Sequence, residues 1–338
     1  MGKAKALATL AIASGPEWLA RLAFAGRRKV VDGRRIDPKA QALGELFNLV
    51  RVPGKIPTLA ESRQSLSAMA ARFDAPCPAQ VAKRDLVVGT VPARMYDTDL
   101  TATDRPTLIY VHGGGWVQGD LDTHDGLCGQ LAFEAGIRVI ALDYRLAPEH
   151  KFPAAPDDVL AAYRTLRADP ATFGVDPDRL AVGGDSAGGN LTSVLMHDLA
   201  EAGLPLPRAQ LLIYPAVDAA MTTRSMQALR TAYVLPVDRI GWYLDQYLPD
   251  GQDRADPRVS PINSPHLAGQ PPACVIVGGH DPLWDDGLML AARLRSSGVP
   301  VDVLEYPGQI HVFVSVRKVV PQGVEAVSRA SAWLRSVL

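Results

Sequence analysis

From Thr107 to the C-terminus, short apolar runs alternate with helix-length segments, and this rhythm limits the possible folds more than any other feature. The runs are Thr107–Val111, Arg138–Leu142, Arg179–Gly183, Gln210–Tyr214, Ala273–Gly278 and Val301–Tyr306. Runs that are apolar throughout are typical of strands covered on both faces, as in a parallel sheet built from βαβ units. The sequence therefore predicts an α/β domain with a mostly parallel central sheet and helices on both faces.

The segments between these runs are long enough for helices. We expect them near Asp122–Ala135, Pro156–Ala168, Ala187–Ala202, Asp286–Ser297 and Val324–Val337. Ahead of the rhythm, the β-rich runs Val81–Val88 and Val91–Tyr96 flank Gly89-Thr90 and predict an antiparallel pair that opens the sheet. Pro92 has no N–H for a strand ladder, so the second strand should start at or just after it, or lie at an edge.

Two segments do not follow the rhythm. Residues 1–75 are predicted to form helices and connectors, with Pro38 opening one helix after Asp37. Residues 216–270 are too long for one crossover helix and contain a helix-like stretch, Asp238–Tyr247. Because an insertion over strand ends usually shapes a pocket, we predict cap segments at 1–75 and about 216–270 on a catalytic domain spanning 76–338.

Composition excludes several classes of function. The chain has 35 basic and 36 acidic residues, a formal net charge of −1, which gives no electrostatic footprint for nucleic acid or an anionic membrane. Its cysteines, Cys77, Cys128 and Cys274, are scattered and indicate neither a disulfide framework nor a zinc site. No apolar run reaches the roughly 18 residues of a membrane span. We expect a soluble protein without a metal that acts on a small molecule.

The N-terminus carries a weak resemblance to a secretion signal. Lys3 and Lys5 precede the short apolar run Ala6–Ala13. Beyond Pro16, however, apolar residues such as Trp18 alternate with charged ones, which predicts an amphipathic helix that docks on a surface. We therefore expect a cytoplasmic protein.

Gly184–Gly189 reads Gly-Asp-Ser-Ala-Gly-Gly and lies between a predicted strand and a predicted helix. This places Ser186 at the tip of a tight strand-to-helix turn, where side chains at Gly184 and Gly188 would collide as the backbone folds back. The serine hydroxyl would stand exposed at the strand end, which is the position of a nucleophile. The G-x-S-x-G spacing alone is a weak signal.

Asp281 and His311 supply the partners that such a serine needs. Each follows a predicted strand, and the carboxyl ends of parallel strands meet at the same edge of a sheet. The chain order Ser, Asp, His is that of the α/β-hydrolase fold. We predict that His311 accepts the proton of Ser186 and that Asp281 orients and stabilises the imidazole.

Other residues compete for these roles. His280 could replace His311, although it lies on the loop that already supplies Asp281. Asp285 and Asp286 could replace Asp281, although Asp286 is expected to cap or open the following helix. Asp185 is expected to orient the serine turn rather than to act chemically.

The segment His112-Gly113-Gly114-Gly115-Trp116 directly follows a predicted strand. Its glycines permit close approach of the backbone to a substrate. We predict that the N–H groups of Gly114, Gly115 and Ala187 form the oxyanion hole, with Gly113 less suited to donate directly. The same loop also fits a dinucleotide-binding pattern, but the serine, aspartate and histidine explain it better.

Together these motifs resemble those of the hormone-sensitive-lipase-like esterases of the α/β-hydrolase superfamily. The resemblance rests on four stretches: His112–Trp116, Asp143–Glu149, Gly184–Gly189 and Asp281–Leu283. It runs from about residue 80 to the C-terminus, and the two irregular segments resemble that family's two-part cap. Val312 departs from the pattern, because the family often has glycine after the histidine.

The resemblance implies an α/β-hydrolase fold and a carboxylesterase that uses no cofactor and cleaves esters of short to medium acyl chains. It also implies a homodimer through the last strand of the sheet, near Val301–Tyr306. An amidase or deacetylase with the same triad remains an alternative, as does a non-catalytic small-molecule receptor on this scaffold. Receptors of that kind have lost the histidine that His311 provides.

Several large side chains are candidates for the substrate pocket, although aromatic residues on a covering helix more often serve simple packing. They are Trp116, Tyr233, Leu235, Trp242 and Tyr243. Arg145 and Glu149 are expected to form a charged pair that braces the turn beside the site.

Overall fold

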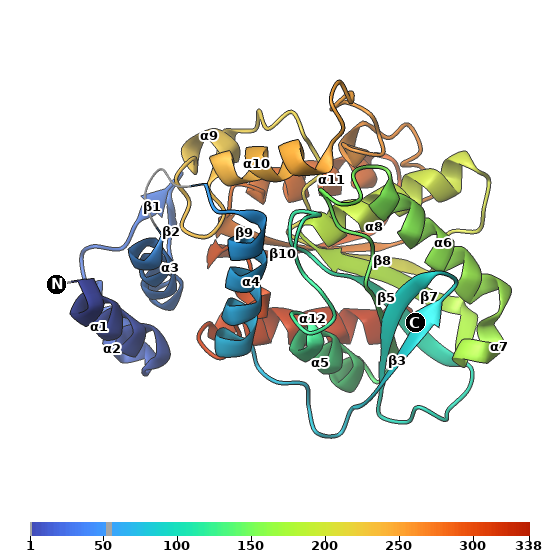
Figure 1. Ribbon diagram of the computed structural model, residues 1–338, viewed down its shortest axis with the longest axis horizontal. Helices are drawn as coiled ribbons and strands as arrows, with labels where there is room; N and C mark the ends of the chain where they lie inside the picture. Colours follow the sequence, from blue (N-terminus) through green and yellow to red (C-terminus); the bar gives the residue numbers. More distant parts are fainter. Residues whose placement is uncertain (1, 52–55) are drawn as a thin grey trace.

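The computed structural model describes residues 2–51 and 56–338; residue 1 and residues 52–55, which belong to the predicted N-terminal cap segment, lie outside the described residues. The described chain contains an eight-stranded sheet with the order β10-β9-β8-β7-β5-β6-β4-β3 (Figure 1). The strands are β3 (Ala82–Val88), β4 (Val91–Asp97), β5 (Arg105–Val111), β6 (Arg138–Leu142), β7 (Val175–Asp185), β8 (Ala209–Ile213), β9 (Ala273–His280) and β10 (Val301–Ile310). All neighbours from β6 to β10 pair in parallel, which confirms the predicted architecture.

Helices cover both faces of this sheet (Figure 1). On one face lie α5 (Asp125–Ala135) and α12 (Pro321–Val337), and on the other lie α6 (Ala154–Ala168), α8 (Ala187–Glu201) and α11 (Trp284–Ser296). The short turns are α7 (Pro170–Phe173), η1 (Pro261–Asn263) and η2 (Phe313–Ser315). Every predicted helix is present, with ends that differ from the prediction by a few residues.

Strand β5 shows why its run is apolar throughout. Leu108 and Tyr110 join the core cluster that includes α5 and α12, whereas Ile109 and Val111 join the cluster that includes α6 and α8. All four side chains are fully buried. A strand covered on both faces has no polar side, so no alternation appears in the sequence.

The expectation for Pro92 is wrong in position. Strand β4 begins one residue earlier, at Val91, and it is an internal strand between β3 and β6 rather than an edge strand. Pro92 is tolerated because pairing with β6 starts only at Ala93, so no partner in β6 needs its missing N–H. Its carbonyl accepts a hydrogen bond from the N–H of Asp143 at 2.8 Å.

The predicted N-terminal cap segment consists of helices α1 (Gly2–Ser14), α2 (Glu17–Ala23), α3 (Pro38–Val50) and α4 (Leu59–Phe73), with a small hairpin of β1 (Val30–Val31) and β2 (Arg34–Arg35). Asp37 caps α3 by accepting from the N–H groups of Lys39 and Ala40. Thr58 and Glu61 form a capping box at the start of α4. These local signals explain where the two longer helices begin.

The insertion between β8 and β9 contains α9 (Arg224–Ala228) and α10 (Val237–Tyr247). Ile240, Tyr243, Leu244 and Tyr247 of α10 are buried in the same cluster as α6 and α8. In Figure 1 this helix passes above the upper end of α4, so that both predicted cap segments meet there.

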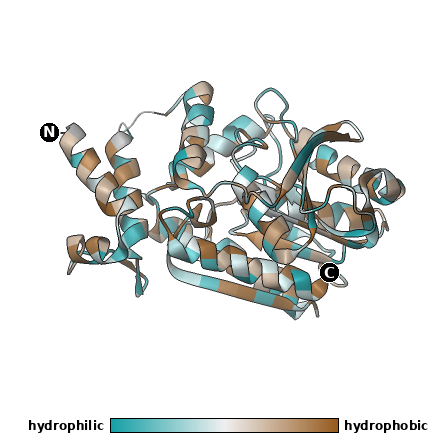
Figure 2. Ribbon diagram, turned by 90° about the horizontal axis from the view of Figure 1, so that it is seen from below, coloured by the Kyte–Doolittle hydropathy of each residue, from teal (hydrophilic) through white to brown (hydrophobic). Residues whose placement is uncertain are grey.

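Helix α2 does not dock in the way its pattern predicts. Trp18 and Leu22 are 60% and 66% exposed, and only Ala20 of this helix is buried. Figure 2 shows hydrophobic segments along the helices next to the N-terminus. No helix among the described residues is long and apolar enough to cross a membrane.

Candidate active site

Ser186 lies in the turn from β7 to α8, with φ 55° and ψ −116°. A Cβ on Gly184 would lie 2.3 Å from the carbonyl oxygen of Val111, and one on Gly188 would lie 1.9 Å from the same atom. Neither position can hold a side chain without moving β5. The two glycines therefore allow the chain to hold Ser186 in a conformation that L-residues rarely adopt.

The structure brings Ser186, His311 and Asp281 together. His311 Nε2 lies 3.0 Å from Ser186 Oγ, and His311 Nδ1 lies 2.6 Å from Asp281 Oδ2. Asp281 is fully buried, and its other oxygen accepts the N–H of Leu283 at 2.9 Å. These side chains follow β7, β10 and β9, three strands that end at one edge of the sheet.

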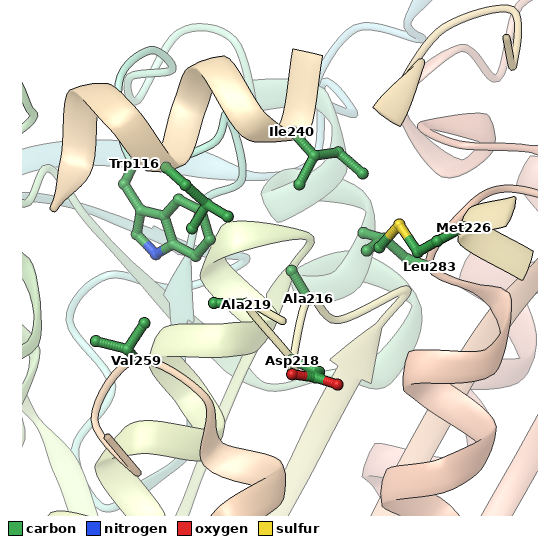
Figure 3. A pocket seen from close by; sticks show the side chains of 9 residues that line it. Trp116, Ala216, Asp218, Ala219, Met226, Ile240, Val259 and Leu283 are labelled. Atoms are coloured by element: carbon green, nitrogen blue, oxygen red, sulfur yellow. The ribbon is translucent and has the colours of Figure 1, made fainter. Parts of the chain in front are cut away.

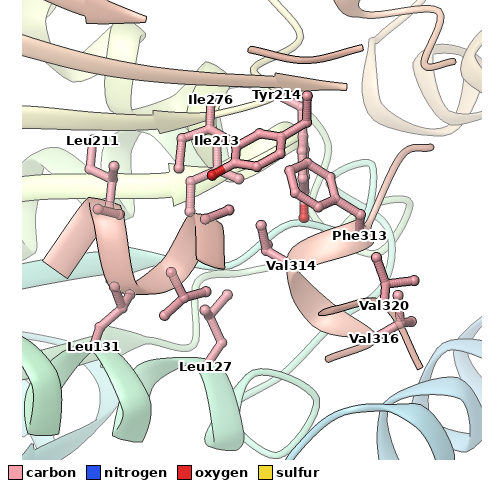
Figure 4. Close-up of a cluster of buried hydrophobic side chains, with 14 of the residues drawn as sticks. Leu127, Leu131, Leu211, Ile213, Tyr214, Ile276, Phe313, Val314, Val316 and Val320 are labelled. Carbon is pink, nitrogen blue, oxygen red and sulfur yellow. The ribbon is translucent and has the colours of Figure 1, made fainter. Parts of the chain in front are cut away.

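Aromatic side chains pack against the loop that carries His311. The ring of Tyr214 lies 4.6 Å from the imidazole, and Phe313 packs next to it in the cluster that α5 and α12 share (Figure 4). Val312 has φ 63°, a left-handed conformation that favours glycine. Val312, at which the sequence departs from the expected glycine, therefore adopts a conformation that glycine would reach without strain.

The competing histidine faces away from the serine. His280 Nε2 lies 3.0 Å from the carbonyl oxygen of Arg34 in β2. Burial, only partly offset by this hydrogen bond, lowers the pKa of His280 to about 4. His280 therefore remains neutral near pH 7 and links β9 to the small hairpin.

The two competing carboxylates bind backbone N–H groups of the insertion. Asp285 Oδ2 accepts the N–H of Ser225 at 2.7 Å, and Asp286 Oδ2 accepts the N–H groups of Val217 and Asp218 at 3.0 and 3.3 Å. The expectation that Asp286 caps or opens α11 is wrong, because it lies inside the first turn and binds the start of the insertion instead. Burial raises its pKa to about 8.

The glycine loop after β5 has an unusual backbone. Gly114, Gly115 and Trp116 have φ values of 128°, 63° and 60°. The N–H of Gly113 already donates to Asp185 Oδ1 at 2.9 Å, whereas those of Gly114, Gly115 and Ala187 have no acceptor among the described residues. The three candidate oxyanion donors are thus free to bind a substrate oxygen.

Asp185 anchors this loop through a buried set of polar contacts. Besides Gly113, it accepts the hydroxyl of Tyr110 at 2.8 Å and lies 3.3 Å from His124 Nε2. Burial disfavours both charges, but the charge and hydrogen bond of Asp185 raise the pKa of His124, and those of His124 lower the pKa of Asp185. The sequence offered no signal for His124, because it belongs to none of the motifs.

Trp116 lines a small, mostly apolar pocket (Figure 3). The other lining residues are Ala216, Asp218, Ala219, Met226, Ile240, Leu244, Val259 and Leu283. One lining residue contacts the backbone of the candidate nucleophile, since the N–H of Ala216 donates to the backbone oxygen of Ser186 at 3.3 Å. Trp116 is held by a parallel stack on Tyr247, with ring centroids 4.6 Å apart.

The other four candidates for the substrate pocket are not among its lining residues. Tyr233 packs on Gly44 of α3, and Leu235 is buried in the cluster that includes α8. Trp242 lies under the guanidinium of Arg239, 4.4 Å away. Tyr243 packs against Gly115 of the glycine loop.

The expected pair of Arg145 and Glu149 does not form. Arg145 binds Asp158 of α6 at 2.7 Å, and Glu149 binds Arg63 of α4 at 2.7 Å. The turn between them thus connects α6 to the N-terminal cap segment. No group of His, Cys, Asp and Glu in the described part of the chain could hold a metal ion.

The chain is similar to known ester hydrolases. A family model for the alpha/beta hydrolase fold matches residues 108–315. The carboxylic ester hydrolase LipN of Mycobacterium tuberculosis is 40% identical over 309 residues, covering 88% of this chain and 81% of its own. The ethyl acetate hydrolase of Pseudomonas putida is 40% identical over 241 residues, covering 70% and 76%.

A solved structure extends this similarity to the fold. An esterase from the bacterial hormone-sensitive lipase family aligns with a TM-score of 0.77 at 34% identity, covering 84% of this chain and 93% of its own. This agrees with the motifs on which the resemblance rests. The chain belongs to the α/β-hydrolase superfamily, within its hormone-sensitive-lipase-like esterases.

Proposed function

We propose that the protein hydrolyses carboxylic esters of short to medium acyl chains through an acyl-enzyme formed on Ser186. The observation that carries this proposal is the hydrogen-bonded chain from Ser186 through His311 to Asp281. Free N–H groups of Gly114, Gly115 and Ala187 beside the serine support it.

In the first half of the reaction, Ser186 Oγ attacks the ester carbonyl carbon while His311 Nε2 takes the hydroxyl proton. The carbonyl oxygen becomes an oxyanion that the N–H groups of Gly114, Gly115 and Ala187 stabilise. Asp281 stabilises the imidazolium. The imidazolium then protonates the leaving alkoxide, the C–O bond to the alcohol breaks, and the acyl group remains on Ser186.

In the second half, His311 takes a proton from water as the water oxygen attacks the acyl-enzyme. The second tetrahedral intermediate uses the same oxyanion donors. Its collapse returns the proton to Ser186 Oγ and releases the carboxylic acid. No cofactor takes part in this sequence.

Ser186→Ala tests the proposal directly. We expect kcat on p-nitrophenyl acetate to fall about 10⁶-fold, because the nucleophile is lost. A fluorophosphonate should label the wild-type protein at Ser186 and leave the variant unlabelled, while circular dichroism confirms that both are folded. Near wild-type turnover by the variant would refute the proposal, and a protein that binds ligand but resists labelling would favour a receptor.

An amidase would use the same residues but must expel a poorer leaving group. We expect p-nitrophenyl esters to be cleaved much faster than the matching anilides. The opposite ranking would favour an amidase over an esterase.

We propose that the apolar residues around Trp116 limit acyl length, since they enclose only about 10 Å³ of free space and a longer acyl chain would need them to move. We propose that 1–75 and about 216–270 act as the two parts of a cap above this pocket. Among p-nitrophenyl esters from acetate to laurate, we expect kcat/KM to fall for the longest chains. Equal rates across the series would contradict this size limit.

We further propose a cytoplasmic homodimer in which β10, the edge strand at one end of the sheet, pairs with its copy. Light scattering after gel filtration should give twice the mass of one chain. Disrupting the edge with Val303→Pro should then yield monomers, and an unchanged mass would place the interface elsewhere.

A further inference from the structure

The glycine loop rests on the insertion as well as on Asp185. A Cβ on Gly115 would lie 2.4 Å from Tyr243 Cγ, so this glycine packs directly on the tyrosine ring. A Cβ on Gly114 would lie 2.0 Å from the backbone oxygen of Gln118. The backbone N–H of Gln118 in turn donates to the backbone oxygen of Gly114 at 3.1 Å and closes the turn. Two of the candidate oxyanion donors are thus seated on Tyr243 and Gln118.

A polar chain joins these two residues to both cap segments. Gln118 Nε2 donates to Tyr243 Oη at 2.9 Å, Ser62 Oγ donates to Gln118 Oε1, and Arg239 Nη2 donates to Ser62 Oγ at 2.5 Å. Since a guanidinium can only donate, Arg239 sets the direction of the whole chain. This series of hydrogen bonds therefore runs from α10 to α4, on to the loop after β5, and back to α10.

Three of the residues that form these hydrogen bonds are buried, and the fourth, Arg239, also packs on the ring of Tyr243. Gln118, Ser62 and Tyr243 are 7%, 2% and 8% exposed, and Arg239 lies 4.9 Å above the ring of Tyr243. In a setting of low dielectric, hydrogen bonds hold their geometry more tightly than they do in water, and losing one leaves an unsatisfied buried group. Removing one link should consequently shift the glycine loop rather than leave it in place.

We propose that Tyr243 and Gln118 are positioning residues through which the two cap segments set the geometry of the oxyanion hole. This inference rests on the ester hydrolysis proposed above. Neither side chain touches the reacting atoms, and neither lines the pocket at Trp116. Oxyanion donors act mainly in the transition state, so a fault in their placement appears in kcat rather than in KM.

Tyr243→Phe removes one hydroxyl and keeps the ring on Gly115. We expect kcat on p-nitrophenyl acetate to fall about tenfold, with KM within about twofold, because a small displacement of donors is costly. The matched control is Tyr163→Phe, the same change at a buried tyrosine of α6 whose hydroxyl donates to the backbone oxygen of Pro205 at 2.9 Å, ahead of β8 and at the other end of the strands. The control should keep wild-type kcat.

A second variant separates positioning from loss of fold. Gln118→Met removes the other end of the same hydrogen bond, so the double variant should be no slower than the slower single variant. A trifluoromethyl ketone, whose adduct with Ser186 carries an oxyanion, should bind more weakly to Tyr243→Phe in proportion to kcat/KM. Thermal unfolding of every variant is measured alongside.

The outcomes separate the two proposals. If Ser186→Ala keeps its activity, ester hydrolysis at Ser186 fails, and the positioning role fails with it. If Ser186→Ala is inactive but Tyr243→Phe keeps kcat, or changes only KM, the positioning role alone is overturned. Effects of Tyr243→Phe and Gln118→Met that multiply in the double variant would also overturn it.

Discussion

The turn that carries Ser186 and the two cap segments are held in different ways. Around Ser186 the contacts are between backbone atoms: its N–H donates to Ile213, its carbonyl accepts from Asn190, and Gly188 touches Val111. The cap segments share a few backbone hydrogen bonds with the rest of the protein, such as Asp37 N–H to the Gly308 oxygen at 2.8 Å, but they also depend on side chains that reach across it, such as Arg63 to Glu149. Apart from Gly184 and Gly188, where no side chain fits, these backbone hydrogen bonds do not use side chains, whereas each side-chain contact is lost with a single substitution.

The comparison suggests that some substitutions should abolish catalysis without unfolding the protein. Others should weaken the attachment of the cap segments without abolishing catalysis. The following changes test this division, from the largest expected effect to the smallest.

Asp281→Asn should disable the catalytic site and leave the fold nearly intact. We expect kcat to fall about 10⁴-fold, because the amide favours the wrong tautomer of His311 and no longer stabilises its cation. The asparagine can still accept the N–H of Leu283, so the melting temperature should change little. A melting temperature that fell along with kcat would show that scaffold and chemistry are not separable here.

Arg317→Met should lower the stability of the protein and leave its turnover largely intact. Arg317 Nε and Nη2 bind both oxygens of Asp74, which ends α4, at 2.7 and 3.0 Å, and both side chains are buried. Removing one partner leaves an uncompensated charge, so the free energy of unfolding in urea should fall by about 3–5 kcal/mol. Turnover by the folded variant at 25 °C should remain far above that of Asp281→Asn.

The double variant Asp74→Leu with Arg317→Met provides the control. Replacing both charges with apolar groups removes the unpaired charge, so most of the lost stability should return. Stability that stayed as low as in the single variant would show that the pair contributes more than mutual neutralisation.

Asp286→Asn tests the joint between scaffold and insertion through pH. Burial raises the pKa of this carboxyl in the folded protein to about 8, well above its ordinary value of 3.8. Between these values the folded state binds a proton that the unfolded state lacks, so this group makes stability fall as pH rises from about 4 to 8. Asparagine does not titrate, so the melting temperature of the variant minus that of the wild type should increase as the pH rises over that range. A constant difference would contradict the raised pKa.

The extent to which the site could be predicted follows the same division. Ser186, Asp281 and His311 each follow a recognisable apolar run, and the rule that strand ends share an edge predicts that they meet. The preference for Gly114 over Gly113 as an oxyanion donor stays a prediction, which the hydrogen bond from the Gly113 N–H to Asp185 supports. Such inferences need only the order of the elements along the chain.

The contacts of the cap could not be predicted in this way. Arg145 binds Asp158 and not Glu149, and Tyr243 supports Gly115 instead of lining the pocket at Trp116. These outcomes depend on side-chain directions between elements far apart in the sequence. Periodicity shows which face of a helix is apolar, but not which residue of another segment lies against it.

The unusual backbone of Ser186 is shared by its neighbours. Trp116, Tyr214 and Val312 also have positive φ, at 60°, 35° and 63°, although none is glycine. Each such residue costs on the order of 1–3 kcal/mol, in a protein class whose total stability is about 5–15 kcal/mol. The enzyme bears this cost continuously, with or without an ester bound. Selection for heat resistance alone would therefore be expected to relax these four residues first, and with them the readiness of the resting enzyme to react.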